Sequence, residues 1–548
     1  MSVFIGYPSF MAYQMMKGKK GNNDDFPSIP GMIARYSALG LTNEQMAANP
    51  VWVDKTGNGH DIQLKNFPWK GMSGVGGYEM NFNLWGNNVL GIPDISMSKT
   101  TTSVSVSVGN STTYNNNLIY IHKNNWDINK NHWLKVTSTY EDGDLTFQFY
   151  NNGNTKTIGL PANGYVNILA YPEFKGSYMY ISTTSNKQGS FTVEQLPLYP
   201  GALVFDGVDD YGTCNNFPIM TKEKGYTGVA LRSYLAESTG YLVYNGTSAK
   251  QSAFAFERSD SLDTWSWGIN SSIRNSLPKL MSYQTSNSYN NNIISTGTAI
   301  EGDKLIRIAS VGGYSNVAIW ELVFLDHDAT EEELTKIKDY FVKTYPWLFP
   351  DQAWTVVGKT NEDEDRATIA NITGNGNDLV LSNFGFAEGS GYNEEGEYAG
   401  YLVTDGVDDK ITSSAFEMGK DFTVVGEWRF IIDERKVAGL IKPPSFYLFN
   451  ENNGLKLFIN NTEKSSSLNT KSLKAICSDG RVYFDDWSEM LLSEEQPITS
   501  SSKDLSIGYN STIYTQMAFK NLGIYNDQLL SKDDCIKAYN YLQTLKAK

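Results

Sequence analysis

The feature that most constrains the fold is an internal repeat whose two parts are unequally spaced. The segment TGNGHDIQLKNF at residues 56–67 matches TGNGNDLVLSNF at 373–384 without a gap, a separation of 317 positions (56 to 373). A second pair, ALVFDGVDDYG at 202–212 and YLVTDGVDDKI at 401–411, is separated by 199 positions (206 to 405). The difference, 317 − 199 = 118 residues, is about one domain. One unit is therefore predicted to occur twice, with a further domain inserted in its first copy.

Both copies also end alike, in an apolar strand followed by a helix. NVAIWELVFLDHDATEEELTKIKDYF at 316–341 parallels QMAFKNLGIYNDQLLSKDDCIKAYNYL at 516–542. The helix starts predict two capping boxes, Thr330 with Glu333 and Ser531 with Asp534. After each cap, apolar residues recur at three-and-four spacing, so each helix is expected to pack one apolar stripe across the end of its own sandwich.

Composition and patterning predict an all-β chain. Of 548 residues, 40% are hydrophobic and 13% aromatic, which favours a folded protein over a disordered one. Alternating runs typical of half-buried strands occur at 103–108, 144–149 and 178–183. Asn453-Gly454 and Asp479-Gly480 lie between apolar runs and predict two tight two-residue hairpins.

The repeat and its insertion divide the chain into five expected segments. They are an N-terminal arm (1–31), the opening part of a first β-sandwich (32–82), an inserted smaller sandwich (83–196), the remainder of the first sandwich (197–350) and an intact second sandwich (351–548). A sandwich tolerates such an insertion at a surface hairpin.

Charge and hydropathy exclude several kinds of partner. The chain carries 45 Lys and Arg against 60 Asp and Glu, a net charge of −15, and its basic residues form no long run, so nucleic acid is not an expected partner. No stretch approaches the ~20 apolar residues of a membrane-spanning helix, so no membrane is expected. The first twenty residues place their charge after the apolar part, which predicts no secretory signal peptide.

Cysteine and histidine supply little material for catalysis or metal binding. The three cysteines lie far apart and are expected to be free thiols: Cys214, Cys477 and Cys535. The four histidines are scattered, which argues against a metal centre or a Ser-His-Asp site: His60, His122, His132 and His327.

Several of these segments resemble a known superfamily. FDGVDDY at 205–211, the following GYTGVALRSYL and the closing LGIYNDQLLSKDD at 522–534 resemble LamG-like, concanavalin A-like jelly-roll domains. The resemblance implies two such jelly rolls, the first interrupted by the inserted sandwich, and each closed by a short C-terminal helix. It covers about three hundred residues in two copies.

A narrower resemblance concerns the segment beginning TGNGHDIQLKNFPWKGMSGVGG and the phrase LYPGALVFDGVDDYG at 198–212. Both resemble fibre-type and surface proteins of gut Bacteroidales and of their bacteriophages, including crAss-like phages. This implies a virion component, such as a head fibre, a tail fibre or a tail-associated protein, that displays carbohydrate-binding sandwiches toward host surface glycans. Homo-oligomers, trimers among them, are expected from the same resemblance.

Acidic residues are the first candidates for chemistry. Glycoside hydrolases of concanavalin A-like fold carry an E-x-D-x-x-E strand, which this sequence lacks, so no enzymatic activity is expected. The nearest acidic run, residues 361–366, is interpreted as a solvated loop. A glycan-degrading depolymerase with acids in unmatched loops stays an alternative.

Two repeated motifs have both a structural and a functional interpretation. The aspartates of the DGVDD motifs are Asp206, Asp209 and Asp210 in the first copy and Asp405, Asp408 and Asp409 in the second. The pattern favours a structural turn, with a calcium site as the alternative. The TGNGHD and TGNGND motifs predict tight turns, and because His60 is replaced by Asn377, no imidazole is required there.

Exposed aromatic rings are the usual platform for sugars. Trp265 and Trp267 are predicted to share one face of a strand, and Trp126 and Trp133 are candidates in the inserted sandwich. Burial in a core is the alternative for each. The sequence therefore assigns no catalytic, metal or ligand-binding residue.

The expected function is structural and adhesive, in a phage particle, with host carbohydrate and other virion proteins as partners. The N-terminal arm, rich in Met, Phe and Tyr, could insert into a neighbouring subunit or form a partly ordered terminus. A purely architectural virion protein without sugar binding is the second alternative.

Overall fold

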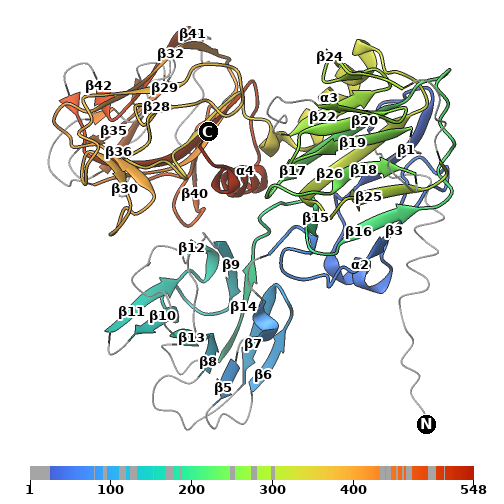
Figure 1. Ribbon diagram of the computed structural model, residues 1–548. Helices are drawn as coiled ribbons and strands as arrows, with labels where there is room; N and C mark the ends of the chain where they lie inside the picture. Colours follow the sequence, from blue (N-terminus) through green and yellow to red (C-terminus); the bar gives the residue numbers. More distant parts are fainter. Residues whose placement is uncertain are drawn as a thin grey trace, which may run out of the picture.

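The computed structural model of the chain describes 25–78, 81–84, 86–89, 95–109, 119–123, 133–151, 154–167, 178–183, 188–246, 253–272, 280–297, 303–431, 438–439, 446–451, 454–459, 462–463, 472–491, 501–510 and 513–547. These residues form three antiparallel β-sandwiches (Figure 1). The predicted fold class is confirmed: two large sandwiches, the first interrupted in sequence by a smaller one, and each large sandwich closed by a helix. The five predicted residue boundaries stay a prediction.

The first sandwich pairs two eight-stranded sheets. In spatial order, one sheet contains β4 (Gly74–Val75), β15 (Leu203–Asp206), β26 (Asn316–Leu325), β17 (Thr227–Tyr234), β22 (Met281–Thr285), β23 (Ser288–Tyr289) and β24 (Asn292–Ile293), with β1 (Met32–Ser37) also pairing with β26. The other contains β2 (Val51–Trp52), β3 (Ile62–Lys65), β16 (Tyr211–Cys214), β25 (Ile306–Ser310), β18 (Tyr241–Asn245), β19 (Phe254–Arg258), β20 (Asp263–Ser266) and β21 (Ile269–Ser272). A short helix, α2 (Asn43–Ala48), lies between β1 and β2.

The second sandwich repeats this topology. Its larger sheet contains β30 (Gly391–Asn393), β31 (Tyr401–Val403), β44 (Met517–Asn526), β33 (Phe422–Phe430), β38 (Ala475–Cys477), β39 (Arg481–Tyr483) and β40 (Glu489–Leu491), with β27 (Gln352–Thr355) also pairing with β44. Facing it are β28 (Thr368–Ile369), β29 (Leu379–Ser382), β32 (Lys410–Met418) and β41 (Ser501–Ile507). The remaining strands are β34 (Ala438–Gly439), β35 (Phe446–Glu451), β36 (Gly454–Ile459), β37 (Thr462–Glu463), β42 (Tyr509–Asn510) and β43 (Ile513–Tyr514).

The sheet that contains β26 and the sheet that contains β44, called the helix-bearing sheets, agree in register as well as in strand order. In the first, β17 and β26 pair through Leu231 and Glu321 and then slip, which leaves Trp320 as the bulged residue. In the second, β33 and β44 pair through Glu427 and Asn521 and then slip, which leaves Lys520 bulged. A β-bulge is a specific local feature, so its recurrence at one place makes these strands equivalent, residue by residue.

Each helix-bearing sheet carries a C-terminal helix on its outer face, so the prediction that the helix packs across the end of the sandwich is wrong. The helices are α3 (Glu331–Thr344) and α4 (Lys532–Thr544). Their apolar stripes and the sheet faces below form one continuous buried cluster, the helix-side cluster, which includes Val229, Leu231, Val323, Leu325, Ile337 and Phe341 in the first sandwich, Trp347 between the sandwiches, and Val425, Cys477, Tyr525, Cys535, Ile536 and Tyr539 in the second.

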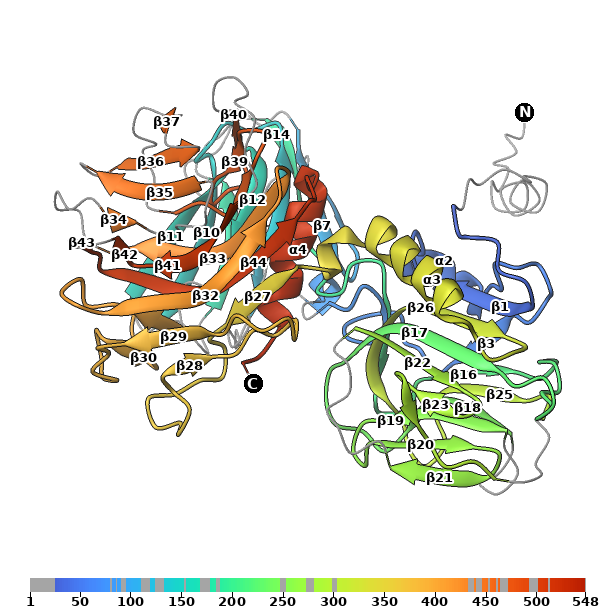
Figure 2. The same ribbon diagram turned by 90° about the horizontal axis from the view of Figure 1, so that it is seen from above.

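The segment between the two sandwiches packs on α4. A 3₁₀ turn, η3 (Pro346–Leu348), follows α3 because proline at its first position cannot continue the α-helix. The Lys537 ammonium lies 4.2 Å from the ring centre of Trp347, and the Tyr525 hydroxyl donates to the Trp347 carbonyl at 2.8 Å. Figure 2 shows α4 lying between the two large sandwiches.

Helix starts are fixed by hydroxyl groups. Thr330 and Glu333 form the predicted capping box at α3. At α4, Ser531 accepts from the Asp534 N–H, but the aspartate bonds the serine hydroxyl at 2.7 Å instead of reaching back to the backbone. The aspartate side chain is one methylene shorter than glutamate, so the predicted reciprocal bond is not formed.

A threonine of the central strand fastens the loop that leads into each helix. The Thr227 hydroxyl donates to a loop carbonyl and accepts from the Ala329 N–H, both at 2.7 Å. The Thr423 hydroxyl donates to the Gln528 carbonyl at 2.9 Å and accepts from the Leu530 N–H at 3.0 Å. This identical device shows that each helix is docked on its sheet by the same contacts in both copies.

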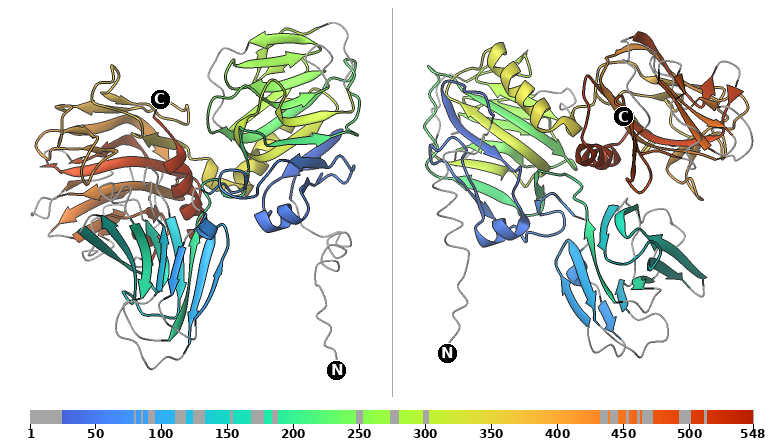
Figure 3. Two further views of the ribbon diagram at one scale, coloured as in Figure 1. Left: turned by 60° about the horizontal axis from the view of Figure 1, so that its bottom comes forward. Right: turned by 180° about the vertical axis from the view of Figure 1, so that it is seen from behind.

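The inserted sandwich has two five-stranded sheets. One contains β11 (Asn154–Leu160), β10 (Leu145–Asn151), β13 (Tyr178–Thr183), β8 (Ile119–Lys123) and β5 (Gly86–Val89), and the other β12 (Asn163–Asn167), β9 (Trp133–Ser138), β14 (Gly189–Gln195), β7 (Ser103–Val108) and β6 (Ile95–Lys99). The turn η1 (Phe82–Leu84) precedes them. The alternating runs predicted to be strands are confirmed as β7, β10 and β13. The Tyr165 N–H donates to the Asp486 carbonyl at 3.2 Å, so this sandwich contacts the second one (Figure 3).

Both predicted hairpins form, but neither turn consists of the predicted pair of residues. Glu451 pairs with Gly454, so this glycine belongs to β36 and the connection is residues 452–453, outside the described residues. At the second hairpin, Ile476 pairs with Val482, and Gly480 adopts a φ of 91°. The three residues 478–480 form this turn, in which the glycine supplies the left-handed position.

The N-terminal arm is described only from residue 25 onward. Phe26 stacks edge-on against Tyr340 of α3 at 4.7 Å, and Asp25 pairs with Lys343 at 2.9 Å. Residues 1–24, on which the idea of insertion into a neighbouring subunit depends, lie outside the described residues. All three cysteines are free, as predicted, and the structure buries each of them.

We predict that Thr423→Val destabilises the second sandwich. The substitution keeps the side-chain shape but leaves the buried N–H of Leu530 without its partner, which costs about 1–3 kcal/mol. Unfolding in urea, followed by tryptophan fluorescence, measures the loss. Thr412→Val is the control, since this half-buried threonine lies on a strand face of the same sandwich; it should change stability by less than about 0.5 kcal/mol. Equal effects of the two substitutions would contradict the docking role.

Candidate functional site

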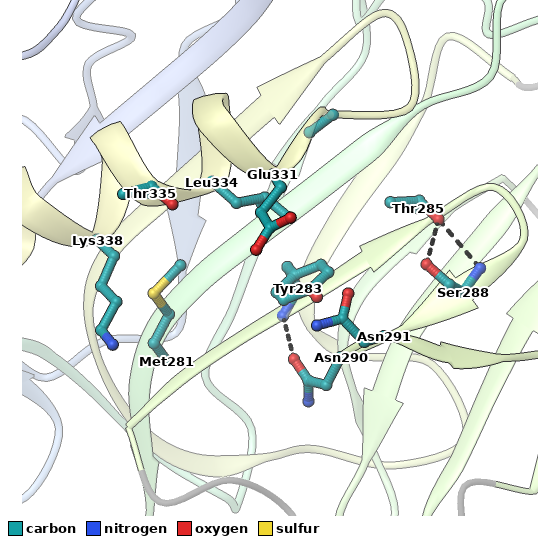
Figure 4. A pocket seen from close by; sticks show the side chains of 11 residues that line it. Met281, Tyr283, Thr285, Ser288, Asn290, Asn291, Glu331, Leu334, Thr335 and Lys338 are labelled. Atoms are coloured by element: carbon teal, nitrogen blue, oxygen red, sulfur yellow. Dashed lines mark hydrogen bonds between the residues drawn. The ribbon is translucent and has the colours of Figure 1, made fainter.

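An open groove of about 680 Å³ lies beside α3 in the first sandwich (Figure 4). Its wall on one side is a helix face, and on the other the outer face of β22 with the β23–β24 hairpin. The residues that line it are Met281, Tyr283, Thr285, Ser288, Asn290, Asn291, Ala329, Glu331, Leu334, Thr335 and Lys338. The four helix residues recur at three-and-four spacing, so they form one face of α3.

The hairpin wall is held rigidly. Asn290 and Asn291 form its two-residue turn, with φ values of 44° and 65° that suit asparagine at such positions. The Asn290 side-chain oxygen accepts from the Tyr283 N–H at 2.9 Å, and the Thr285 and Ser288 hydroxyls bond each other at 2.7 Å (Figure 4). The positions of the polar groups on this wall are therefore set before any ligand arrives.

The lining combines one aromatic ring with several kinds of polar group. Tyr283 is half-buried; burial raises the pKa of its hydroxyl, although a hydrogen bond from the Asn291 backbone opposes the shift. Asn291 on the same wall offers both donors and acceptors, and across the groove Glu331 offers acceptors and Lys338 offers donors. Met281 and Leu334 contribute apolar surface. A shallow groove with one ring, amides and charged groups suits a polar ligand with both hydroxyl groups and C–H faces.

The equivalent face of α4 in the second sandwich is sealed. Counted from the two N-caps, Thr335 of α3 corresponds to Ile536 of α4, and Lys338 corresponds to Tyr539. Ile536 and Tyr539 are buried in the helix-side cluster, whereas Thr335 and Lys338 are exposed. The same helix position is thus packing surface in one copy and groove lining in the other.

The hairpins differ in the same sense. In the second sandwich, the loop between β39 and β40 carries Trp487, which is 1% exposed and lies 5.7 Å from the Tyr539 ring, edge to face. In the first sandwich, Tyr289 pairs with Asn292, so the turn of the hairpin consists of only two residues, Asn290 and Asn291. Because no bulky side chain extends from this shorter turn toward α3, the groove stays open.

The DGVDD aspartates form two compact clusters, each with carboxylate oxygens within 4.8 Å of one another. Asp206 accepts from the N–H groups of Val208 and Asp209 at 2.8 and 3.4 Å, and Asp210 accepts from the Asp206 N–H at 3.0 Å. The second cluster repeats these bonds. The carboxylates are directed at their own backbone, which supports the predicted turn, and they carry no metal assignment.

The TGNG motifs are also structural. Asp54 accepts from the backbone N–H groups of Arg35 and Thr56, at 3.1 and 3.0 Å. At the equivalent place, Asn371 accepts from those of Ala353 and Thr373. These bonds fasten each glycine-rich turn to the first strand of its sandwich. The predicted tight turns are confirmed, and their recurrence is explained without a ligand.

The acidic run 361–366 lies in a polar turn, as interpreted from the sequence. Asp363 accepts from the Thr360 N–H and hydroxyl at 2.9 and 3.0 Å, which lowers the pKa of this carboxyl. Asn361 is half-buried, and its side chain exchanges two hydrogen bonds of 2.8 Å with the backbone of Tyr392. Neither residue faces the groove.

The prediction that Trp265 and Trp267 share a strand face is wrong. Strand β20 ends at Ser266, and Trp267 and Gly268 form a turn with φ values of 50° and 81°. Trp267 therefore leaves the strand and is buried between the sheets, while Trp265 packs on a separate cluster with Tyr241 and Tyr244. Trp126 and the side chain of Trp133 lie outside the described residues.

Comparisons with known proteins give no name to this site. No family model matches the chain, and no curated protein matches its sequence. Among solved structures, a Trypanosoma rangeli sialidase in complex with sialic acid is 10% identical, with 85% of this chain and 96% of that chain covered at a TM-score of 0.23. A structure described as an HCR/D mutant is 9% identical, with 59% and 89% covered at a TM-score of 0.21. Neither likeness is close enough to indicate what this chain binds.

None of the described helices has the length and apolar character required to span a membrane.

We predict that stability falls as pH rises toward neutrality, because of the buried DGVDD aspartates. Burial raises the pKa of Asp210 to about 7 and that of Asp409 to about 6, from an ordinary value of 3.8. Between those values the folded state retains protons that the unfolded state has released. This stabilisation is complete below the unfolded pKa and is lost as pH rises through the folded pKa.

Urea unfolding at a series of pH values tests this expectation. Asp210→Asn should flatten the decline between about pH 4 and pH 7, because the amide keeps an acceptor but cannot ionise. Asp209→Asn, exposed in the same turn, should leave the slope as in the wild type. An unchanged slope in Asp210→Asn would contradict the assignment.

Proposed function

We propose that this protein is a carbohydrate-binding adhesin, and that the groove beside α3 of the first sandwich holds the sugar. The observation that carries the proposal is the contrast between copies: the same site is filled by Ile536, Tyr539 and Trp487 in the second sandwich and is open and polar in the first. The first copy has solvent-facing polar residues at the position where the second copy has packing residues. In the first copy this position therefore does not contribute to packing. The lining suits a sugar, since Tyr283 offers a ring and the neighbouring groups bond hydroxyls.

Binding without hydrolysis is part of the proposal. Cleavage of a glycosidic bond ordinarily uses two carboxyl groups, roughly 5 to 10 Å apart, on either side of the bond. Among the described residues that line the groove, Glu331 is the one carboxylate. The lining therefore favours a binding site over a depolymerase, the alternative enzyme.

A place on a bacteriophage particle is the finer part of the proposal. It is supported by the sequence resemblance of the TGNG and DGVDD segments to fibre-type phage proteins, and by an architecture in which several sandwiches are arranged along one chain. Mass spectrometry of purified particles and immuno-labelling of their surface test it. Detection on the particle exterior supports a fibre or tail-associated protein, and absence from particles contradicts the virion role.

The groove is tested by closing it with the residues of the second copy. Thr335→Ile with Lys338→Tyr should fill the groove and reduce binding on a glycan array at least tenfold, because the introduced side chains occupy the ligand volume. Lys336→Tyr, on another face of the same helix, is the matched control and should bind as the wild type. Thermal melting of all three proteins verifies folding.

Three results would contradict the proposal. A blank array for the wild type would favour the purely architectural alternative. Full binding by the doubly substituted protein would place the sugar elsewhere. Release of reducing sugars from a bound polysaccharide would show that the protein is a hydrolase.

A further inference from the structure

A second polar site lies on the outer face of the second sandwich, beyond the cover of α4. Strand β33 presents Val425, Glu427 and Arg429 in turn on this face, because alternate residues of a strand point the same way. Val425 is buried in the helix-side cluster. Glu427 is buried next to α4, and the Arg429 side chain is 34% exposed. The row therefore runs from packing surface to open surface.

Glu427 already has all the partners it needs. Lys474 donates to one of its oxygens at 2.7 Å, and the Tyr539 hydroxyl of α4 bonds the same oxygen. The Tyr401 hydroxyl donates to the other at 3.0 Å. Although burial alone would raise the pKa of Glu427, the positive charges of Lys474 and Arg429 and the hydrogen bonds from Lys474 and Tyr539 lower it to about 2. This carboxylate is thus ionised, and both of its oxygens accept hydrogen bonds.

Two further cations beside it are not matched in this way. Arg429 Nε lies 3.6 Å from the nearer Glu427 oxygen, too long for a hydrogen bond, and this buried N–H has no partner among the described residues. The Lys520 ammonium lies 5.4 Å from the centre of the Tyr401 ring, and within the described part of the chain no hydrogen bond or ion pair involves it. Asp485, the other nearby acid, is engaged by Ser472 and Lys474.

The electrostatics of Lys520 agree with this excess of positive charge. Burial lowers the pKa of its ammonium, Glu427 opposes the shift, and Lys474 and Arg429 lower it further. A half-buried ammonium beside two other cations is costly unless an anion or solvent compensates it. An added anion would relieve both the desolvation and the like-charge repulsion.

In the first sandwich, the positions equivalent to Lys520 and Arg429 carry uncharged residues. Lys520 occupies the bulge at which the first copy has Trp320, fully buried, with its indole N–H bonded to the Pro200 carbonyl at 2.8 Å. Arg429 pairs with Ala518, as Ser233 pairs with Ala318 in the first copy. Where one copy has tryptophan and serine, the other has lysine and arginine.

We propose that Arg429 and Lys520 bind an anionic group, a carboxylate, sulfate or phosphate, on the outer face of the second sandwich. The planar guanidinium supplies paired donors to two oxygens of the group, and the ammonium supplies a point charge beside it. The Tyr401 ring lies beside the ammonium, with its centre 5.4 Å from the Lys520 nitrogen, and its hydroxyl is held by Glu427. The group is either a substituent of an acidic glycan or a free inorganic anion.

Calorimetric titration of the full chain tests the site, with three probes: sodium sulfate, a sulfated oligosaccharide and the same oligosaccharide without sulfate. We expect saturable binding of sulfate by the wild type and at least a tenfold loss in Arg429→Gln with Lys520→Gln. Lys420→Gln removes an exposed cation from the same sandwich and should bind as the wild type. Thermal melting of the variants without anion verifies that they fold.

The probes distinguish the two sources. At least tenfold tighter binding of the sulfated oligosaccharide than of sulfate, with no binding of its desulfated form, identifies an acidic glycan. Equal affinities for sulfate and the sulfated oligosaccharide identify a free anion. No saturable binding of either sulfated probe, or unchanged binding in the doubly substituted protein, overturns the proposal.

Discussion

The docking of a helix on the outer face of each helix-bearing sheet is the interaction on which the rest of the structure depends. A sheet of this kind has two faces, and the opposite sheet can cover only one of them. The helix-side cluster covers the second, and the hydroxyls of Thr227 and Thr423 fasten to the sheet the loop that leads into each helix. How completely the helix covers its sheet then decides what remains open to a ligand.

Duplication gives the chain an internal reference for every such position. At the helix face, the second copy is apolar and sealed by Trp487, and it serves as a joint between sandwiches, whereas the first copy is polar and open. At the strand bulge the contrast is reversed, since Trp320 packs in the first copy and Lys520 stands among cations in the second. Thus the second copy keeps packing residues at the helix face and the first copy keeps them at the strand bulge. At the other of these two positions, each copy has polar or charged residues instead.

Much of the fold could be predicted from the sequence because it is encoded by local, repeated features: glycine-rich turns, alternating strands and helix caps. Trp267 could not be placed in this way. It is in the core because it lies in a turn with a left-handed backbone conformation, which the sequence pattern does not predict for a tryptophan. Neither candidate site could be predicted. The groove is open because the two-residue turn carries no bulky side chain that extends toward α3. The anion site contains Tyr401, Arg429 and Lys520, which come from three strands that only the folded sheet brings together.

The most direct test of the central claim, that one unit diverged at matched positions, is a crystal structure with a neutral oligosaccharide that the protein binds. The account predicts sugar density against Tyr283 and α3 in the first sandwich and none at the sealed face of α4. Sugar bound only to the inserted sandwich, or equally at both helix faces, would contradict it.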